Sequence, residues 1–286
     1  MNIDKLQLTK LNFSELETLI SWAKEEGWDP GLSDATLFWE TDPNGFYGYF
    51  NNQELVAGGA IVSYNGEFGF MGLFIVHPKY RHLGIGRKLW HQRKNKLLSR
   101  INKDASIGLD GVVAMQDFYN KGGFDIAFRD ERHEKLGAHF KVHTHVSKIS
   151  ELDTEDVIKY DTECFGFHRP QFLLPWLKQP YGFSFKYVES GLLKGYAVLR
   201  KTWKGYKICP LFADDQFIAE ELYKACLNEV PNELVYIDIP MNNKLAVDLV
   251  FKYQTTYIFE CARMYLNNMP SIPNQKIFGI TTFELG

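Results

Sequence analysis

Hydrophobic and polar residues follow two different spacings along this chain, and the changes between them divide it into helices and strands. Residues 3–8 predict a short opening strand. Helical spacing then begins near Asn12, with Ser14 and Glu17 placed as in a capping box. A second, shorter helix is expected over residues 33–39. Apolar runs broken by Asn and Gly turns predict a meander of three strands over residues 46–50, 55–64 and 68–76.

The same alternation continues to the end of the chain. A helix that begins near Ile85, a strand over 105–109, a short helix around Phe118 and a strand over 124–128 complete the first half, and residues 131–150 are interpreted as an exposed strand or hairpin with a linker. The second half repeats this order. Its helices are expected over residues 153–165, 172–177, 214–228 and 243–253, and its strands over residues 183–188, 194–201, 206–211, 234–239, 257–266 and 277–283. This order predicts an α/β fold, with an α+β mixed sheet and helices packed on it.

The most informative stretch joins the third strand of the meander to the helix that follows. Pro78 ends the strand because proline has no N–H for a sheet, and Gly84-Ile85-Gly86 leads into the helix. Such a turn can cradle a phosphate group, because the free amides of the first helical turn point at the anion. The alternative is a tight turn that only packs the helix on the strand. A dinucleotide-binding motif is disfavoured because Leu89 replaces its third glycine, and no Gly-Lys-Ser/Thr completes a P-loop.

Five residues around this turn, Val76, Pro78, Arg81, Gly84 and Gly86, form the pattern Val-x-Pro-x-x-Arg-x-x-Gly-x-Gly. The pattern resembles the acetyl-CoA-binding motif of the GNAT acetyltransferase superfamily. The resemblance implies that backbone amides of one segment hold the coenzyme pyrophosphate, namely those of Arg81, His82, Leu83, Gly84, Ile85, Gly86 and Arg87. It also implies that the amides of the pantetheine arm pair with the end of the preceding strand, at Phe74, Ile75 and Val76.

A second motif supports this resemblance. Residues 118–124 read Phe-Tyr-x-Lys-x-Gly-Phe and are similar to a segment that GNAT domains carry on a helix after the cradle. In the second half, Asn243 and Ala246 resemble the Asn-x-x-Ala segment of these domains. The cradle itself is not repeated there. Asp214 and Asp215 stand in its place, and their carboxylates would repel a pyrophosphate and cap the helix.

The whole chain therefore resembles the tandem, YitH-type branch of the superfamily. This implies two GNAT-like domains, each a central, mostly antiparallel sheet flanked by helices. Residues 1–147 are expected to form the domain that binds acetyl-CoA. Residues 148–286 are expected to form a degenerate domain that serves as a wall or lid for the acceptor.

The resemblance implies direct transfer of an acetyl group from acetyl-CoA to a primary amine of a small molecule or peptide, which needs an acid and a base. Tyr119 matches the position of the acid that protonates the leaving thiolate; the alternative is a packing role. Asp110 is the best available base because residues 70–76 contain no carboxylate, and its alternative role is structural. The oxygen of the thioester is expected to meet a backbone N–H near Phe74 or Ile75. Candidate walls of the acceptor site, each with a core position as the alternative, are Trp28, Phe38, Trp39 and Tyr47.

Net charge, apolar runs and cysteine spacing argue against several other classes of protein. A net charge of −3 disfavours nucleic-acid binding. No apolar run is long enough for a membrane span and no signal peptide is visible, so a cytoplasmic location is expected. The four widely spaced cysteines are interpreted as reduced thiols. His143 and His145 share one face of a strand, but no acidic or Cys partner lies close by, so no metal is expected.

Two other functions stay open at this point. Because the strand before the cradle has no carboxylate, the protein is alternatively an acyl-CoA-binding sensor without catalysis. Because 15% of its residues are aromatic, it is alternatively an acyltransferase that uses a longer acyl-CoA. The acceptor and the oligomeric state are left undetermined by the sequence.

Overall fold

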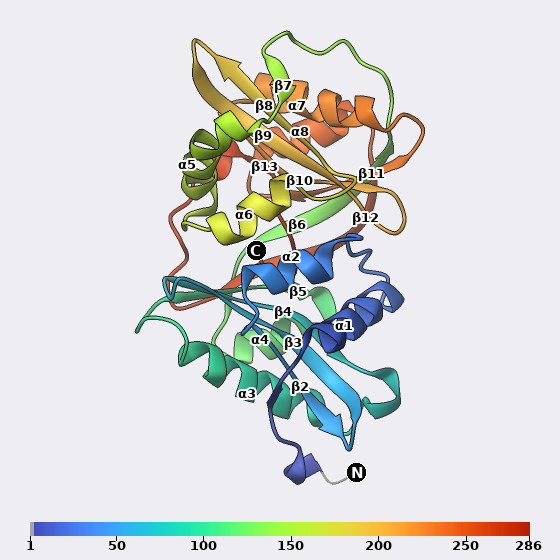
Figure 1. Ribbon diagram of the computed structural model, residues 1–286, viewed down its shortest axis with the longest axis vertical. Coiled ribbons are helices and arrows are strands. Elements are labelled where there is room, and N and C mark those ends of the chain that lie inside the picture. Colours follow the sequence, from blue (N-terminus) through green and yellow to red (C-terminus); the bar gives the residue numbers. More distant parts are fainter. Residues whose placement is uncertain (1–2) are drawn as a thin grey trace.

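A computed structural model of the chain describes residues 3–286. The elements of the first half follow the hydrophobic pattern closely (Figure 1). They are β1 (Thr9–Lys10), α1 (Phe13–Glu25), α2 (Asp34–Thr41), β2 (Phe46–Asn51), β3 (Glu54–Tyr64), β4 (Phe68–Val76), α3 (Ile85–Leu98), β5 (Ser106–Val112), α4 (Gln116–Lys121) and β6 (Asp125–Leu136).

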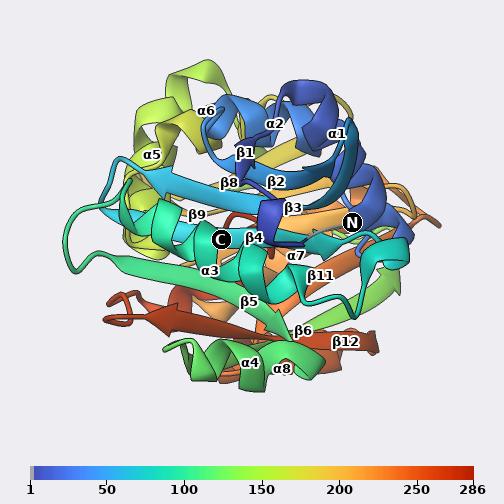
Figure 2. The same ribbon diagram turned by 90° about the horizontal axis from the view of Figure 1, so that it is seen from below.

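The second half repeats the alternation of helices and strands. Its elements are β7 (Val146–Lys148), α5 (Thr154–Phe165), α6 (Pro170–Leu177), β8 (Phe183–Glu189), β9 (Leu192–Lys201), β10 (Tyr206–Ala213), α7 (Gln216–Glu229), β11 (Leu234–Pro240), α8 (Lys244–Lys252), β12 (Thr256–Leu266) and β13 (Ile277–Gly279). Viewed along the long axis, α1, α2, α5 and α6 lie together on one side of the molecule, and α4 and α8 on the other (Figure 2).

The start of the chain differs from the predicted strand. Residues 3–5 form a turn of 3₁₀-helix, and strand pairing is confined to β1 against β2. The Lys88 ammonium donates hydrogen bonds to the backbone carbonyls of Ile3 (2.8 Å), Asp4 (3.1 Å) and Leu6 (3.0 Å). These carbonyls are thus bound by a side chain of α3 and not by a neighbouring strand.

The cap of α1 also differs from the prediction, because the capping box uses Asn12 and Glu15. The Asn12 side chain accepts a hydrogen bond from the Glu15 amide (3.0 Å), and the Glu15 carboxylate accepts one from the Asn12 amide (2.7 Å). Ser14 lies inside the first turn, where its carbonyl accepts from the Thr18 hydroxyl. Starting the helix at Phe13 places that ring against Trp39, with 5.9 Å between the ring centroids.

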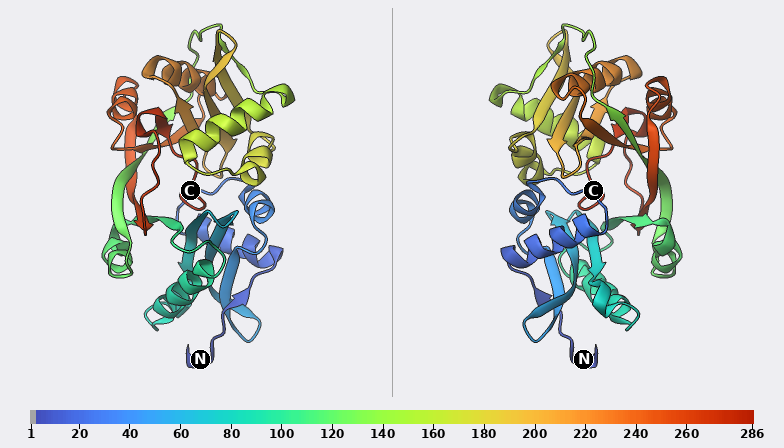
Figure 3. Two further views of the ribbon diagram at one scale, coloured as in Figure 1. Left: turned by 90° about the vertical axis from the view of Figure 1, so that its left-hand side faces the viewer. Right: turned by 90° about the vertical axis from the view of Figure 1, so that its right-hand side faces the viewer.

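One mixed sheet runs through both halves of the molecule (Figures 1 and 3). Its strand order is β1-β2-β3-β4-β5-β12-β6-β11-β10-β9-β8-β7, with β13 paired to β10 beside this path. β12 belongs to the second half by sequence, yet it lies between β5 and β6, where Arg263 is opposite both Asp110 and Phe128. In turn, β6 pairs with β11 over residues 130–136, so the segment expected to be exposed from residue 131 begins inside the sheet. The division at residue 147 stays a prediction.

Each half contains a pair of parallel strands that are connected along the chain by a helix. The two halves differ in the gap that opens where these paired strands separate. β4 pairs with β5 over residues 68–70, and β10 pairs with β11 over residues 206–208. In the second half, β13 adds to β10 at Leu211 and Phe212, and the Ile280 amide donates to the carbonyl of Asp238 in β11 (2.9 Å). The chain therefore fills this gap in the second half with its own strand.

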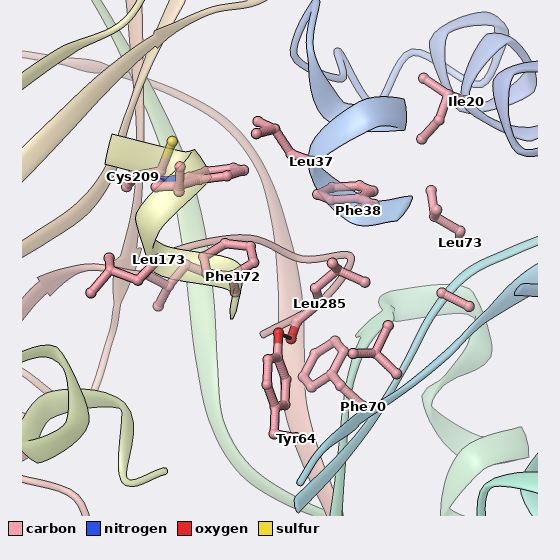
Figure 4. Packing of buried hydrophobic residues seen from close by; sticks show 14 of the residues in the cluster. Ile20, Leu37, Phe38, Tyr64, Phe70, Leu73, Phe172, Leu173, Cys209 and Leu285 are labelled. Atoms are coloured by element: carbon pink, nitrogen blue, oxygen red, sulfur yellow. Dashed lines mark hydrogen bonds between the residues drawn. The ribbon is translucent and has the colours of Figure 1, made fainter. Parts of the chain in front are cut away.

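A large hydrophobic core joins the halves (Figure 4). Phe38 of α2 and Phe70 of β4 belong to the same buried cluster as Phe172 of α6. The hydroxyl of Tyr64 donates to the Leu285 carbonyl (2.8 Å), which anchors the last residues of the chain in this core. Among the described residues, no helix has the length and apolar character that a membrane crossing requires.

Candidate active site

The candidate site is a cavity that opens where β4 and β5 part. These parallel strands pair at three positions only, from Phe68 opposite Ser106 to Phe70 opposite Gly108. Beyond them, Leu73 has a positive φ of 49°, and the register between β3 and β4 shifts at residues 58–60. A cavity of about 400 Å³ lies in the gap. Its walls come from β4, β5, α3 and α4, and also from β12 and the last residues of the chain.

The predicted cradle lies at one side of this cavity. Gly84 is the N-cap of α3 and has φ of +81°, with open space where a side chain would lie. His82 is also left-handed, with φ of 65°. The amides of Ile85, Gly86 and Arg87 are the first of the helix, so they have no carbonyl partner within it. Exposed and positive, this helix start is suited to an anion, and Gly86 and Arg87 line the cavity.

The Arg81 side chain closes the turn. Its Nε donates to the carbonyl of Val76 (3.0 Å), and its Nη2 forms an ion pair with Glu26 at the end of α1. Arg81 thus ties the end of β4 to α1, and both members of the ion pair line the cavity. At the predicted pantetheine strand, Phe74, Ile75 and Val76 all line the cavity.

Tyr119 lies in the cavity wall, on α4. It is 8% exposed, and its hydroxyl has no hydrogen-bond partner among the described residues. Burial raises the pKa of Tyr119 to about 12, while the positive charge of Arg93 opposes the shift. The hydroxyl is therefore protonated at neutral pH and available to a ligand as a donor.

Arg93 of α3 is a fully buried residue of this wall that the sequence analysis did not single out. Its Nη2 donates to the carbonyls of Ala60 and Gly72 (2.8 Å to Gly72), while Nε and Nη1 have no partner among the described residues. Gly59 leaves room for this group, because a methyl group at that position would overlap the guanidinium where it now lies. Burial lowers the pKa of Arg93 to about 10, so the group stays charged at neutral pH.

Asp110 lines the cavity, but its carboxylate is engaged. It accepts two hydrogen bonds from Arg263 of β12, at 2.7 and 2.9 Å, and both side chains are buried. Burial raises the pKa of the Asp110 carboxyl, and Arg263 opposes this shift. The bidentate pair joins β5 of the first half to β12, the strand of the second half that lies between β5 and β6.

Of the four residues expected to line the acceptor site, one lies in the cavity wall. Trp28 lines the cavity. Phe38 is fully buried in the core, Trp39 stacks on Phe46 with a centroid distance of 6.2 Å, and neither belongs to the cavity wall. Tyr47 of β2 also lies outside that wall.

Several wall residues come from the second half and were missed by the sequence analysis. They are Phe259 and Cys261 of β12, and Phe283 and Glu284 of the last segment. The Arg132 guanidinium lies 4.6 Å from the Phe259 ring centroid and 5.4 Å from that of Phe283, and is paired with Asp238. Nothing in the local sequence around these four wall residues indicated that they line a cavity.

At the corresponding position in the second half, two carboxylates occupy the start of the helix. The Asp215 carboxylate caps α7 by accepting from the Ile218 amide (2.9 Å). Asp214 accepts from the Tyr160 hydroxyl (2.9 Å) and pairs with Lys276 and Lys194. His143 and His145 stand 4.6 Å apart by ring centroid, and the described part of the chain contains no group of three or more potential metal ligands.

The chain resembles known proteins along most of its length. Residues 13–124 match the model of the acetyltransferase (GNAT) family, and residues 157–279 match that of an acetyltransferase (GNAT) domain. Over 279 residues, covering 96% of this chain and 92% of the relative, the chain is 29% identical to the holothin acyltransferase of Pseudoalteromonas sp.. It is 24% identical over 224 residues to the uncharacterized N-acetyltransferase YitH of Bacillus subtilis, covering 76% of each chain.

Solved structures show the same fold. A putative acetyltransferase from Pyrococcus horikoshii superposes with a TM-score of 0.85 at 21% identity, covering 100% of this chain and 98% of that chain. A tandem GNAT protein from the clavulanic acid biosynthesis pathway superposes with a TM-score of 0.64 at 12% identity, covering 93% of this chain and all of the other.

Proposed function

The chain belongs to the GNAT superfamily of acyltransferases and contains two GNAT domains in tandem, and we propose that it transfers an acetyl group from acetyl-CoA to a primary amine of a small molecule or peptide. One observation carries this proposal: a helix N-terminus with free amides and a donor hydroxyl face the same cavity between two parting strands. Such an arrangement holds a phosphate at one end and supports acyl transfer inside.

The coenzyme is expected to enter between β4 and α3. The segment from Arg81 to Arg87 would hold the pyrophosphate through its amides, and residues 74–76 of β4 would pair with the pantetheine arm. The residues present fit this group, because Gly84 leaves open space at the helix start and Gly86 keeps side-chain atoms away from it. We expect a single coenzyme per chain, since β13 fills the equivalent gap of the second half.

Tyr119 is the residue that we expect to protonate the leaving thiolate. Its buried hydroxyl is protonated at neutral pH and has no other partner among residues 3–286. Arg93 is the nearby charge that would stabilise the phenolate left behind. We infer that Asp110 instead has a structural role, because its carboxylate is held by Arg263.

A longer acyl group is the second candidate. Met71, Leu109 and Met115 line the cavity together, and their flexible or branched side chains leave an apolar lining for a chain longer than acetyl. The relative that is 29% identical is also named an acyltransferase and not an acetyltransferase. Acyl-CoAs of increasing length therefore belong in the test.

The test measures coenzyme binding by calorimetry and thiol release over a panel of amines, first with the natural chain. Gly84→Glu is expected to abolish binding of acetyl-CoA because it places a carboxylate at the phosphate site. Gly191→Glu is the matched control: Gly191 also has a positive φ (+77°) and open space around it, but lies in a turn of the second half. Undiminished binding by Gly84→Glu would overturn the site, and binding without thiol release for any amine would identify a sensor.

A further inference from the structure

The last segment of the chain places one acidic residue, Glu284, in the wall of the cavity. From β13, it crosses to the first half, where the backbone of Glu284 lies against Gly72 of β4 so closely that a side chain there would overlap the Glu284 carbonyl. The Leu285 carbonyl accepts from the Tyr64 hydroxyl, and the Gly286 oxygen accepts from buried Arg169 (3.3 Å). Glu284 is thereby fixed in the wall of the cavity, 5% exposed.

A local turn fixes the same residue from its other side. The Thr282 hydroxyl oxygen accepts hydrogen bonds from the backbone amides of Glu284 (3.0 Å) and Leu285 (2.8 Å). All these contacts use backbone atoms of residues 284–286, and none uses the Glu284 carboxyl group. The carboxyl group itself is left for another partner.

Glu284 differs from the acids around it because its carboxylate has no hydrogen bond or ion pair within the described residues. Three neighbouring buried acids are each paired with an arginine; the pairs are Asp34–Arg200, Asp110–Arg263 and Asp238–Arg132. Asp130 is also without a partner, but it does not line the cavity. Of the buried acids in this region, Glu284 is the one that lines the cavity with a free carboxylate.

We propose that Glu284 binds the ammonium group of the acceptor and removes its proton before the attack on the acyl group. This rests on the proposed function, and it moves the role of base from Asp110 to a residue of the second half. The proposed base thus lies in the segment that follows β13, the strand that fills the gap between β10 and β11.

A primary ammonium acceptor loses two protons from its nitrogen during the transfer. One N–H proton passes to the Glu284 carboxylate, and the freed electron pair forms the bond from nitrogen to the carbonyl carbon. The bond from that carbon to sulfur then breaks, and the thiolate takes a proton from Tyr119. The second proton of the nitrogen restores the Tyr119 hydroxyl directly or through water, so that one proton, from Glu284, is released per turnover.

The charges around Glu284 suit a base. Burial is the largest effect and raises the pKa of Glu284. A raised pKa is closer to neutral pH, and a general base works best when its pKa lies near the working pH. Lys207 of β10, Arg200 of β9 and Arg132 of β6 oppose the shift, while Asp34 of α2 reinforces it. Asp110 of β5 also interacts electrostatically with Glu284.

The neighbouring wall indicates the class of acceptor. Phe283 precedes Glu284, and its ring lies 5.8 Å from that of Phe259 by centroid, with Arg132 against both. Trp28 lines the same cavity. Aromatic faces beside a carboxylate suit a cation attached to an apolar body, so we assign the acceptor to primary amines that carry an aromatic or other flat apolar group.

The experiment compares the natural chain with Glu284→Gln, using acetyl-CoA and 2-phenylethylamine within a panel of alkylamines of that kind. The substitution keeps the shape and every backbone contact. We expect kcat/KM for alkylamines to fall about 10²–10⁴-fold, with the Kd for acetyl-CoA unchanged. The rise of kcat/KM with pH that reports the base should also disappear. Glu67→Gln, an exposed carboxylate at the far end of β4, is the control and should change none of these.

A second readout separates a base from a residue that only shapes the site. Arylamines such as aniline are already neutral at assay pH, so their transfer should lose much less in Glu284→Gln than that of alkylamines. An equal loss for both classes, or turnover that is unaffected, would overturn this inference and leave the proposed function standing. A natural chain that binds acetyl-CoA but releases no thiol with any amine would overturn both.

Discussion

The backbone carbonyl of Glu284 rests on Gly72, so that the last segment of the chain touches the strand beside the proposed coenzyme cradle without an intervening side chain. The contact joins the two halves at the cavity itself. Because Gly72 carries no side chain, the backbone of Glu284 can lie against β4, and this residue of the second half becomes part of the cavity wall.

Gly72→Ala is therefore expected to displace the last segment. The methyl group would meet backbone atoms, which cannot yield by rotation, so we expect a loss of about 1–3 kcal/mol in stability and a fall in turnover with alkylamines. Gly58→Ala in β3 is the control, because its methyl group would meet only side-chain carbons of Leu19 and Leu11. Denaturant unfolding and thiol release measure both effects; equal behaviour of the two variants would contradict the positioning role of Gly72.

Tyr119→Phe tests the acid. Turnover should fall about 10²–10⁴-fold while the Kd for acetyl-CoA stays the same, because only the proton donor is removed. Tyr49→Phe is a close control: burial also raises the pKa of Tyr49 to about 12, but its hydroxyl bonds to Gln92 (2.7 Å) outside the cavity. Steady-state kinetics on the two variants decide the matter, and full activity in Tyr119→Phe would rule out acid catalysis by this residue.

Asp110→Asn tests the structural role of the ion pair with Arg263. It leaves a buried guanidinium without its counter-charge, which is expected to cost about 3–5 kcal/mol of folding free energy. Glu151→Gln breaks the exposed pair with Lys178 and should leave the unfolding midpoint where it was. Urea unfolding of both variants gives the comparison, and a stable Asp110→Asn protein with reduced turnover would restore Asp110 as a candidate base.

Asp130 is expected to make the stability of the protein depend on pH. Burial, Asp110 and Asp238 raise its pKa well above the ordinary value, and Arg263 opposes them. From about pH 4, the unfolded value, up to the folded pKa, the folded chain holds the extra proton, so this group lowers stability as the pH rises. Asp130→Asn should remove that decline and be more stable than the natural chain at the alkaline end. Melting temperatures across pH 4–9 test this; parallel curves for the two proteins would refute it.

Local chemistry in the sequence predicted the cradle and most of the elements. Pro78, Gly84 and Gly86 determine the conformation of the backbone at their own positions. The spacing of apolar residues distinguishes a helix such as α1 from a strand such as β4. The family resemblance rested on these same short-range features. Phe38 and Trp39 were expected to line the acceptor site, and neither lies in the cavity wall. The local sequence does not distinguish an aromatic residue of the core from one that lines a cavity.

Strand exchange was decided by tertiary structure alone. The spacing within β12 shows that it is a strand, but not that it lies between β5 and β6, because the spacing of a strand does not record which distant strands it pairs with. That pairing brings Arg263 to Asp110, and Phe259 into the cavity. Glu284 reaches the cavity only because β13 and Gly72 fix the path of the last segment. The sequence alone thus determined where a coenzyme cradle could form, and the packing of the two halves determined which side chains face it.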